Sequence, residues 1–360
     1  MAPPGDTEIR LLRADEREPL LALLGEWEMP APWEGRATDF FRRYVERDPS
    51  FETRNVVVAE RERRLISCVQ IFPRVLRAAC EGGGGLAEVP VGGIGSVFTR
   101  FEARGQGVSS ALLERARAEM RARGLELGVL FAARHGFYTR LGWHLWPRAR
   151  PLWRRDGATI QPEAARRIER FDPARHLGEV FALHRAHDAD RPGTCVRDAD
   201  GFRAQLAFAG NPDEEFLLAR DAAGALAAYV RGIVLEGLYC VTELARRAER
   251  AGADALADLV VTLMQPRDPD PLAPAGRASE ALRALLVGPC VTDPALDAAL
   301  DARGVVRSRF SSRDLMLSVL EPAALARRLG VPRRPEDDDA GWLARAWPPE
   351  RMTFWPADRF

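Results

Sequence analysis

The segment from Val97 to Ser109, which reads VFTRFEARGQGVS, constrains the fold more than any other part of the chain. An apolar strand is expected to end near residues 97–99, and a polar turn leads to Gly105 and Gly107. Residues 108–120 then carry apolar side chains at helical spacing, which predicts an amphipathic helix. Because the glycines stand at the N-terminus of this helix, unpaired backbone N–H groups and the helix dipole can receive a phosphate there.

The residues after the loop predict a strand–loop–helix–strand unit. Apolar side chains recur at every fourth position of the helix, and Gly124 supplies the expected stop. These positions are Val108, Leu112, Ala116 and Met120. The stretch from Leu125 to Phe131 becomes fully apolar, as is typical of a buried strand.

Two common nucleotide-binding loops do not fit. A dinucleotide fold requires Gly-x-Gly-x-x-Gly and an acidic residue at the end of the next strand, whereas this chain has Ser110 at the third glycine position and Glu126 at the start of that strand. A Walker loop requires lysine, and the sequence contains none, so that all 52 basic side chains are arginines. The pattern that remains is Arg/Gln-x-x-Gly-x-Gly/Ala, which Arg104, Gly107 and Ser109 follow, with serine at the last position.

A second motif, GFYTRLGW, spans residues 136–143 and follows the loop after one helix and one strand. The two motifs, in this order, resemble those of the GCN5-related N-acetyltransferase (GNAT) superfamily over roughly residues 7–150. The resemblance implies that the glycine loop binds acyl-CoA. It also implies that Tyr138 lies beside the CoA sulfur.

The length of 360 residues predicts two domains. Residues 1–150 are predicted to form a mixed α/β acetyl-CoA-binding domain, 151–170 a linker, and 171–320 a second domain with a loosely similar order of elements, in which Asp314–Leu320 is a late strand. The second domain has no Gly-x-Gly, and Glu249 and Asp254 would repel pyrophosphate at its corresponding helix. We therefore expect tandem acetyltransferase-like domains of which the second is degenerate.

The last 40 residues, 321–360, are predicted to form a docking tail. They contain five aromatic side chains that are costly to leave in water, at roughly 1.5–3 kcal/mol for each large apolar side chain. These residues are Trp342, Trp347, Phe354, Trp355 and Phe360.

Within the superfamily, the arrangement is similar to the enhanced-intracellular-survival (Eis-like) acetyltransferases, which combine an active domain, a degenerate one and a C-terminal region that reaches the active site. The resemblance implies that Tyr138 is the general acid and that the carboxylate of Phe360 belongs to the active site. It also implies a homo-oligomer. The tail is too short for the third domain of that subgroup.

The expected site has three parts. The pantetheine and pyrophosphate of acetyl-CoA are assigned to Val97, Phe98, Thr99, Arg104, Gly105, Gln106, Gly107, Val108 and Ser109. The amine acceptor is assigned to Glu26, Trp27 and Trp33, although a surface loop with aromatic anchors would explain this cluster equally well. No metal is expected, because His184 and His187 fit a solvated helix end better than a metal site.

These observations predict an acetyl-CoA-dependent N-acetyltransferase that acts on a small-molecule or peptide amine. An aminoglycoside, a polyamine, a peptide N-terminus and a lysine side chain all remain open as acceptors. The alternatives are a non-catalytic acyl-CoA sensor or partner-binding protein and, disfavoured by the missing third glycine, an NAD(P)-dependent oxidoreductase. Equal numbers of acidic and basic residues give no argument for nucleic acid, no apolar run suggests a membrane span, and five scattered cysteines are typical of a cytoplasmic protein.

Overall fold

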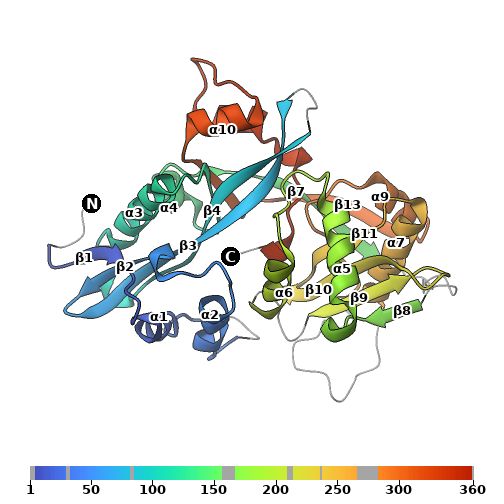
Figure 1. Ribbon diagram of the computed structural model, residues 1–360, viewed down its shortest axis with the longest axis horizontal. Coiled ribbons are helices and arrows are strands. Elements are labelled where there is room, and N and C mark those ends of the chain that lie inside the picture. Colours follow the sequence, from blue (N-terminus) through green and yellow to red (C-terminus); the bar gives the residue numbers. More distant parts are fainter. Residues whose placement is uncertain are drawn as a thin grey trace.

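The computed structural model describes residues 5–29, 33–81, 85–155, 167–208, 214–235, 237–265 and 283–358. Within these ranges the chain forms two seven-stranded mixed sheets that lie side by side, each covered by helices on both faces (Figure 1). We call the first sheet and its helices the first unit, and the second sheet and its helices the second unit. The mixed α/β fold predicted from the sequence is confirmed.

The first sheet has its parallel pair in the middle. Its order is β1 (Glu8–Leu11), β2 (Val56–Arg61), β3 (Arg64–Ala79), β4 (Leu86–Thr99), β5 (Leu127–Phe131), β14 (Leu315–Val319) and β6 (His144–Leu145). Strands β4 and β5 run parallel, and the other neighbours run antiparallel. The cavity described below lies where these two parallel strands separate.

Alternation along the strands assigns the helices of the first unit to opposite faces of the sheet. Helices α1 (Arg17–Leu24) and α2 (Ala37–Glu46) share a core with Val56 and Val58 of β2. The long helix α3 (Val108–Ala122) shares a core with Val57 and Ala59, whose side chains point to the other face. The short helix α4 (His135–Thr139) adds Phe137 and Tyr138 to the α3 side.

The second unit repeats this plan. Its sheet order is β8 (Arg167–Arg170), β9 (Glu215–Arg220), β10 (Leu226–Leu235), β11 (Leu238–Arg246), β12 (Leu285–Val287), β7 (Arg148–Arg155) and β13 (Val305–Ser312). Helices α5 (Pro173–Asp188) and α6 (Ala199–Phe208) lie on one face, and α7 (Arg250–Met264) and α9 (Pro294–Asp301) lie on the other. Helix α5 begins where sequence rules predict, because Asp172 caps it by accepting a hydrogen bond from the backbone N–H of Ala174.

Each sheet contains one strand that its neighbours in the sequence do not predict, because two strands are exchanged between the sheets. Strand β7 follows β6 in the sequence but lies in the second sheet, between β12 and β13. Strand β14 follows β13 but lies in the first sheet, between β5 and β6. The sequence analysis assigned Asp314–Leu320 to the second domain, and the structure corrects this assignment. The apolar pattern of β14 shows that it is buried, but does not show in which sheet.

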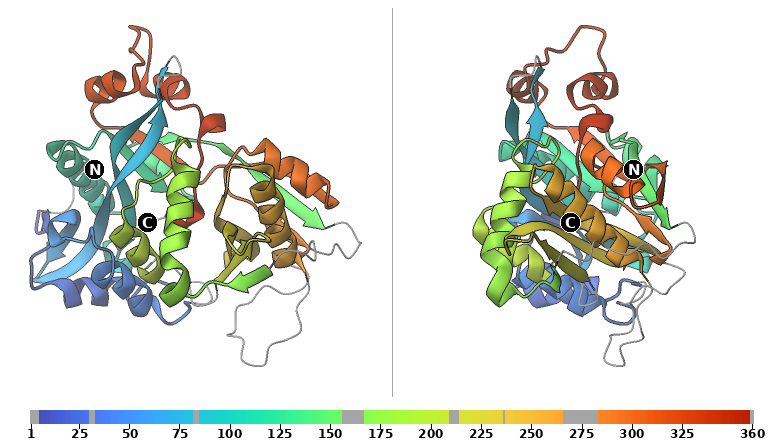
Figure 2. Two further views of the ribbon diagram at one scale, coloured as in Figure 1. Left: turned by 45° about the vertical axis from the view of Figure 1, so that its right-hand side comes forward. Right: turned by 90° about the vertical axis from the view of Figure 1, so that its right-hand side faces the viewer.

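The C-terminal tail docks on both units. Helices α10 (Pro322–Leu329) and α11 (Asp339–Ala346) lie over the first sheet, and the chain then crosses to the middle of the molecule (Figure 2). Trp342 and Trp347 pack into a hydrophobic core of the first unit, together with residues of β4, β5 and β14. Trp355 packs into the core of the second unit that includes α7 and α9. Two 3-10 turns, η4 (Pro349–Arg351) and η5 (Pro356–Asp358), complete the described part of the tail.

Two histidines of α5 differ from the sequence expectation. His184 and His187 are only 2% and 3% exposed, so this helix end is not solvated. Burial places them against β10 and β11, where His184 meets the hydroxyl of Tyr229 and His187 meets the backbone of Arg246. Helical spacing alone did not reveal that another strand covers this end. Among the described helices, none is both long and apolar enough to cross a membrane.

Candidate active site

The site begins where β4 and β5 separate. These strands pair only from Val91 and Leu127 to Ile94 and Leu130. Beyond this point the pairing of β4 with β3 changes register, and Ser96 adopts a positive φ of 49°. Such a bulge bends the strand, and β4 therefore leaves the side of β5.

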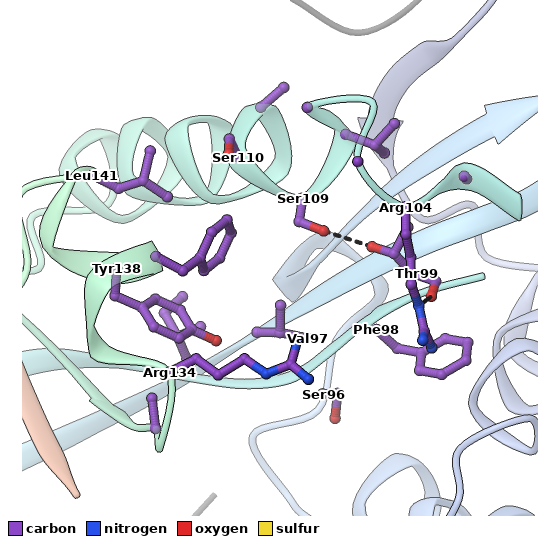
Figure 3. Close-up of a pocket in the computed structure, with 18 of the residues that line it drawn as sticks. Ser96, Val97, Phe98, Thr99, Arg104, Ser109, Ser110, Arg134, Tyr138 and Leu141 are labelled. Carbon is purple, nitrogen blue, oxygen red and sulfur yellow. Dashed lines mark hydrogen bonds between the residues drawn. The ribbon is translucent and has the colours of Figure 1, made fainter. Parts of the chain in front are cut away.

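A cavity of about 1780 Å³ occupies the opening. Its walls come from β4, the end of β5, the glycine loop, the first turn of α3 and helix α4, with the segment after α1 at its edge (Figure 3). The cavity thus brings together the two motifs that the sequence analysis combined. Of the predicted site residues that the structure describes, all but Gln106 and Trp33 line it.

The glycine loop has a backbone that only glycine adopts easily. Gly105 and Gly107 have φ angles of 75° and 81°, in the left-handed region where a Cβ is unfavourable. Gly107 directly precedes α3, and no side chain of the described residues caps this helix end. The first N–H groups of α3 can therefore bind an anion in the cavity.

Side chains around the loop hold it in shape. Arg104 donates from Nε to the carbonyl of Thr99 over 3.0 Å, and the hydroxyls of Thr99 and Ser109 lie 2.6 Å apart (Figure 3). Gln106 does not line the cavity. It accepts a hydrogen bond from Arg61 (2.9 Å) and donates one to the carbonyl of Glu102 (2.8 Å). The role of Gln106 in this structure is to secure the loop.

Strand β4 presents an open edge to the cavity. Val97, Phe98 and Thr99 all line it, and they have no strand partner on the β5 side among the described residues. Backbone groups on such an edge can pair with an extended ligand as a further strand would.

Tyr138 faces this edge from α4. Its hydroxyl points into the cavity, toward Val97 (Figure 3). Its ring packs edge-on against Phe137, with ring centroids 5.0 Å apart. Burial raises the pKa of Tyr138, and the positive charge of Arg134 opposes part of this shift. The hydroxyl therefore keeps its proton at neutral pH and is available as an acid.

The predicted acceptor residues separate into two groups. Glu26 and Trp27 line the cavity; Glu26 forms an ion pair with the buried Arg100, and Trp27 stacks on Phe98 with ring centroids 5.6 Å apart. Trp33 lies away from the cavity lining, with the guanidinium carbon of Arg43 4.3 Å from its ring centroid.

Sequence reasoning missed several lining residues, including Ser96, Phe131 and Arg134. No pattern around Ser96 predicts the bulge, and Phe131 was read only as the end of a buried strand. Arg134 carried no signal, because one arginine among 52 basic residues is not distinctive. Phe360, the predicted second catalytic residue, lies outside the described residues.

The comparisons with known proteins agree with this geometry. Residues 8–146 match the family model of the acetyltransferase (GNAT) domain. The chain therefore carries a domain of the GNAT superfamily, and the protein is an N-acetyltransferase. No match was found among curated proteins.

Solved structures share the fold over both units. A GCN5-related N-acetyltransferase from Kribbella flavida is 19% identical, with a TM-score of 0.58, and the alignment covers 90% of this chain and 74% of that one. Eis1 from Mycobacterium abscessus is 19% identical, with a TM-score of 0.57 and coverage of 89% and 76%. N-myristoyltransferase from Saccharomyces cerevisiae, solved with bound myristoyl-CoA, is 10% identical, with a TM-score of 0.53 and coverage of 89% and 80%. At these identities the likeness shows a shared tandem fold.

Proposed function

We propose that the protein transfers an acetyl group from acetyl-CoA to a primary amine. One observation carries this proposal: a single cavity joins the uncapped glycine loop to the hydroxyl of Tyr138. The open edge of β4 lies between them and can pair with an extended pantetheine arm. The bound myristoyl-CoA of the yeast structure supports an acyl-CoA in a fold of this kind.

The parts of acetyl-CoA are assigned to the cavity in order. The pyrophosphate binds the N–H groups between Gly105 and Ser109, including that of Val108, with Arg104 adding positive charge. The pantetheine pairs with the backbone of Val97, Phe98 and Thr99. One N–H of this edge polarises the thioester carbonyl, which stabilises the negative charge that develops on its oxygen.

The reaction is a direct attack. The neutral amine bonds to the thioester carbon, the C–S bond breaks, and Tyr138 gives its proton to the departing thiolate. The nitrogen loses one proton as the amide forms. Holding both reactants in one cavity supplies much of the acceleration. Glu26 and Trp27 form the part of the cavity wall that binds the amine acceptor, and Trp33 lies outside the cavity lining and packs behind this part of the wall.

The C-terminal carboxylate of Phe360 is our candidate for the group that takes the proton from nitrogen. One contact brings the tail toward the site: Phe354 packs on the cavity residue Phe131, with ring centroids 5.0 Å apart. Adding one glycine after Phe360 moves the charge but keeps the aromatic side chain. We expect a lower kcat, and unchanged kcat with unchanged amine affinity would exclude this role.

The test of the function is thiol release from acetyl-CoA with a panel of amines, together with calorimetric titration of acetyl-CoA. We expect amine-dependent release and one binding site per chain. Tight binding without release for any amine would favour the acyl-CoA sensor. Two equivalent sites would contradict the degenerate second unit.

A further inference from the structure

Arg134 is a charged side chain without a partner inside the cavity. It directly precedes α4 and extends beneath the ring of Tyr138 toward Val97 and Ser96 (Figure 3). Among the residues that the structure describes, its guanidinium group makes no hydrogen bond and no ion pair. The five N–H donors of this group are therefore available to a ligand.

Three other arginines around the site are engaged. Arg100 pairs with Glu26, Arg104 donates to a backbone carbonyl, and Arg61 donates to Gln106. These contacts shape the walls of the cavity. Arg134 makes no such contact with the described residues. Its side chain is exposed, so water meets its donors until an anion of a bound molecule takes the place of that water.

In the proposed position of acetyl-CoA, none of its charged groups lies near Arg134, so the acceptor would supply the anion that Arg134 binds. The phosphates of acetyl-CoA are assigned to the glycine loop, where Arg104 lies, whereas Arg134 lies with Tyr138 near the thioester (Figure 3). A thioester carries no charge. An anion at Arg134 must therefore come from the other substrate.

The same cavity offers an opposite charge for the amine. Glu28 lines it, is exposed, and has no partner among the described residues. An ammonium group can approach Glu28 before it loses its proton, while a carboxylate on the same molecule meets the fork of Arg134. Among the described residues that line the cavity, Arg134 and Arg140 are cations, and Glu28 and Glu114 are anions, without a hydrogen bond or ion pair to another side chain. Of the two cations, Arg134 is the one that extends beneath the ring of Tyr138 (Figure 3).

We propose that the acceptor is an amine that also carries a carboxylate, and that Arg134 binds this carboxylate. This inference rests on the proposed acetyl transfer and narrows its substrate class to amino-carboxylates. Polyamines and aminoglycosides, which carry only positive charge, would meet Arg134 with repulsion.

The first experiment measures kcat/KM for pairs of amines that differ only in the carboxylate. Phenylalanine and 4-aminobutyrate are each compared with their amides, and spermidine and phosphoethanolamine complete the panel. We expect each acid to exceed its amide by about tenfold or more, the scale of a charged hydrogen bond. Equal values for acids and amides, or a preference for spermidine or phosphoethanolamine, would overturn the inference while leaving acetyl transfer in place. Absence of transfer to any amine would instead refute the proposed function.

The second experiment uses variants of Arg134. Arg134→Ala should lower kcat/KM for the acids by about 10- to 100-fold, mainly through KM, and change the amides little. Arg134→Lys keeps the charge and should retain part of the preference. Arg140→Ala removes the same charge from the other end of α4, where Arg140 also lines the cavity, and should preserve the ratio of acid to amide. An equal loss of this ratio in Arg140→Ala would show a general effect of charge and overturn a specific carboxylate site.

Discussion

The two units have the same strand plan but treat the opening between their parallel strands differently. In the second unit β11 pairs with β12 only at Tyr239 and Cys240, and its register with β10 shifts next to Arg231. The same short pair and shifted register create the cavity between β4 and β5 in the first unit. The fold therefore separates two parallel strands in each unit, β4 from β5 in the first and β11 from β12 in the second.

The tail fills the second opening. The backbone N–H of Phe354 donates to the carbonyl of Cys290 over 3.0 Å, and Trp355 is fully buried, with its indole N–H 3.0 Å from a carboxylate oxygen of Asp188. Asp358 completes the contact through its ion pair with Arg197. In the first unit the corresponding space is open and lined by the edge of β4.

Buried polar side chains close the rest of the second opening. Glu243 of β11 accepts hydrogen bonds from Arg197 (2.7 Å) and Tyr229 (2.8 Å), and His184 lies 3.1 Å from the Tyr229 hydroxyl. Glu249 precedes α7, at the place where Gly107 precedes α3. The difference teaches that this fold gives the position of a cofactor site, while local residues decide whether it is open.

The largest expected effect is on kcat, and it distinguishes Tyr138 of the first unit from Tyr229 of the second. Tyr138→Phe keeps the packed ring and removes the proton, so we expect kcat to fall by roughly 10²–10⁴-fold with little change in acetyl-CoA affinity. Because burial raises the pKa of Tyr138, the alkaline decline of kcat in the native protein should lie above the usual value near 10 and be absent from the variant. Steady-state kinetics across pH provide the measurement.

Tyr229→Phe is the matched control for Tyr138→Phe. Its hydroxyl serves the buried network of the second unit, so the variant should lose about 1–3 kcal/mol of unfolding free energy and keep its kcat. Near-normal turnover of Tyr138→Phe would make that tyrosine a packing residue.

Trp355→Ala empties part of the second opening. We expect a loss of about 3–5 kcal/mol of unfolding free energy in urea, the usual cost of removing a buried indole. Acetyl-CoA should still bind once per chain, because no glycine loop precedes α7. Trp347→Ala, which removes a tail tryptophan from the first core, controls for destabilisation alone. A second acetyl-CoA site in Trp355→Ala would show that the tail alone blocks it.

The loop variants sharpen the comparison of the two helix starts. Gly107→Val places a branched side chain at a φ of 81°, and Arg104→Glu puts a negative charge beside the pyrophosphate. Each should weaken acetyl-CoA binding by roughly 100-fold in calorimetry. Glu249→Gln, at the start of α7, should bind as the native protein does. Unchanged affinity in both loop variants would refute the pyrophosphate assignment.

The smallest effect concerns acid stability of the second unit. Burial, followed by the charge of Arg191, lowers the pKa of His187 to about 3, so the folded chain keeps this histidine neutral while the unfolded chain takes up a proton below about 6.5. Its contribution to stability is therefore lost as pH falls from 6.5 toward 3. His187→Gln removes this titration, and the loss between pH 7 and pH 4.5 should shrink by about 2 kcal/mol in urea unfolding. Equal losses in both proteins would contradict a neutral buried His187.

Local signals predicted local structure well. The spacing of apolar residues located α3, and Gly105 and Gly107 located the loop, because each depends on neighbours in the sequence. The sequence analysis placed β14 in the wrong sheet. Its position depends on pairing with β5 and β6, which lie far away in the sequence, and its own apolar pattern does not record that pairing. Arg134 was not predicted as a site residue for a related reason. Its proposed role depends on its place in the cavity and on which residues surround it there, and the spacing of residues in the sequence does not show this.

The exchange of β7 and β14 has a consequence for the order of folding during synthesis. A ribosome that has made residues 1–155 has released β1 to β6 without the strand that separates β5 from β6. That strand emerges only after nearly 160 further residues, so the first sheet closes through contacts of very high sequence separation, which slow folding. A chain truncated after residue 150 would lack β14, an interior strand of the sheet that bears the candidate site. The first sheet is therefore completed by residues that follow the whole second sheet in the sequence, so a gene that lost the second half would also lose part of the sheet that bears the candidate site.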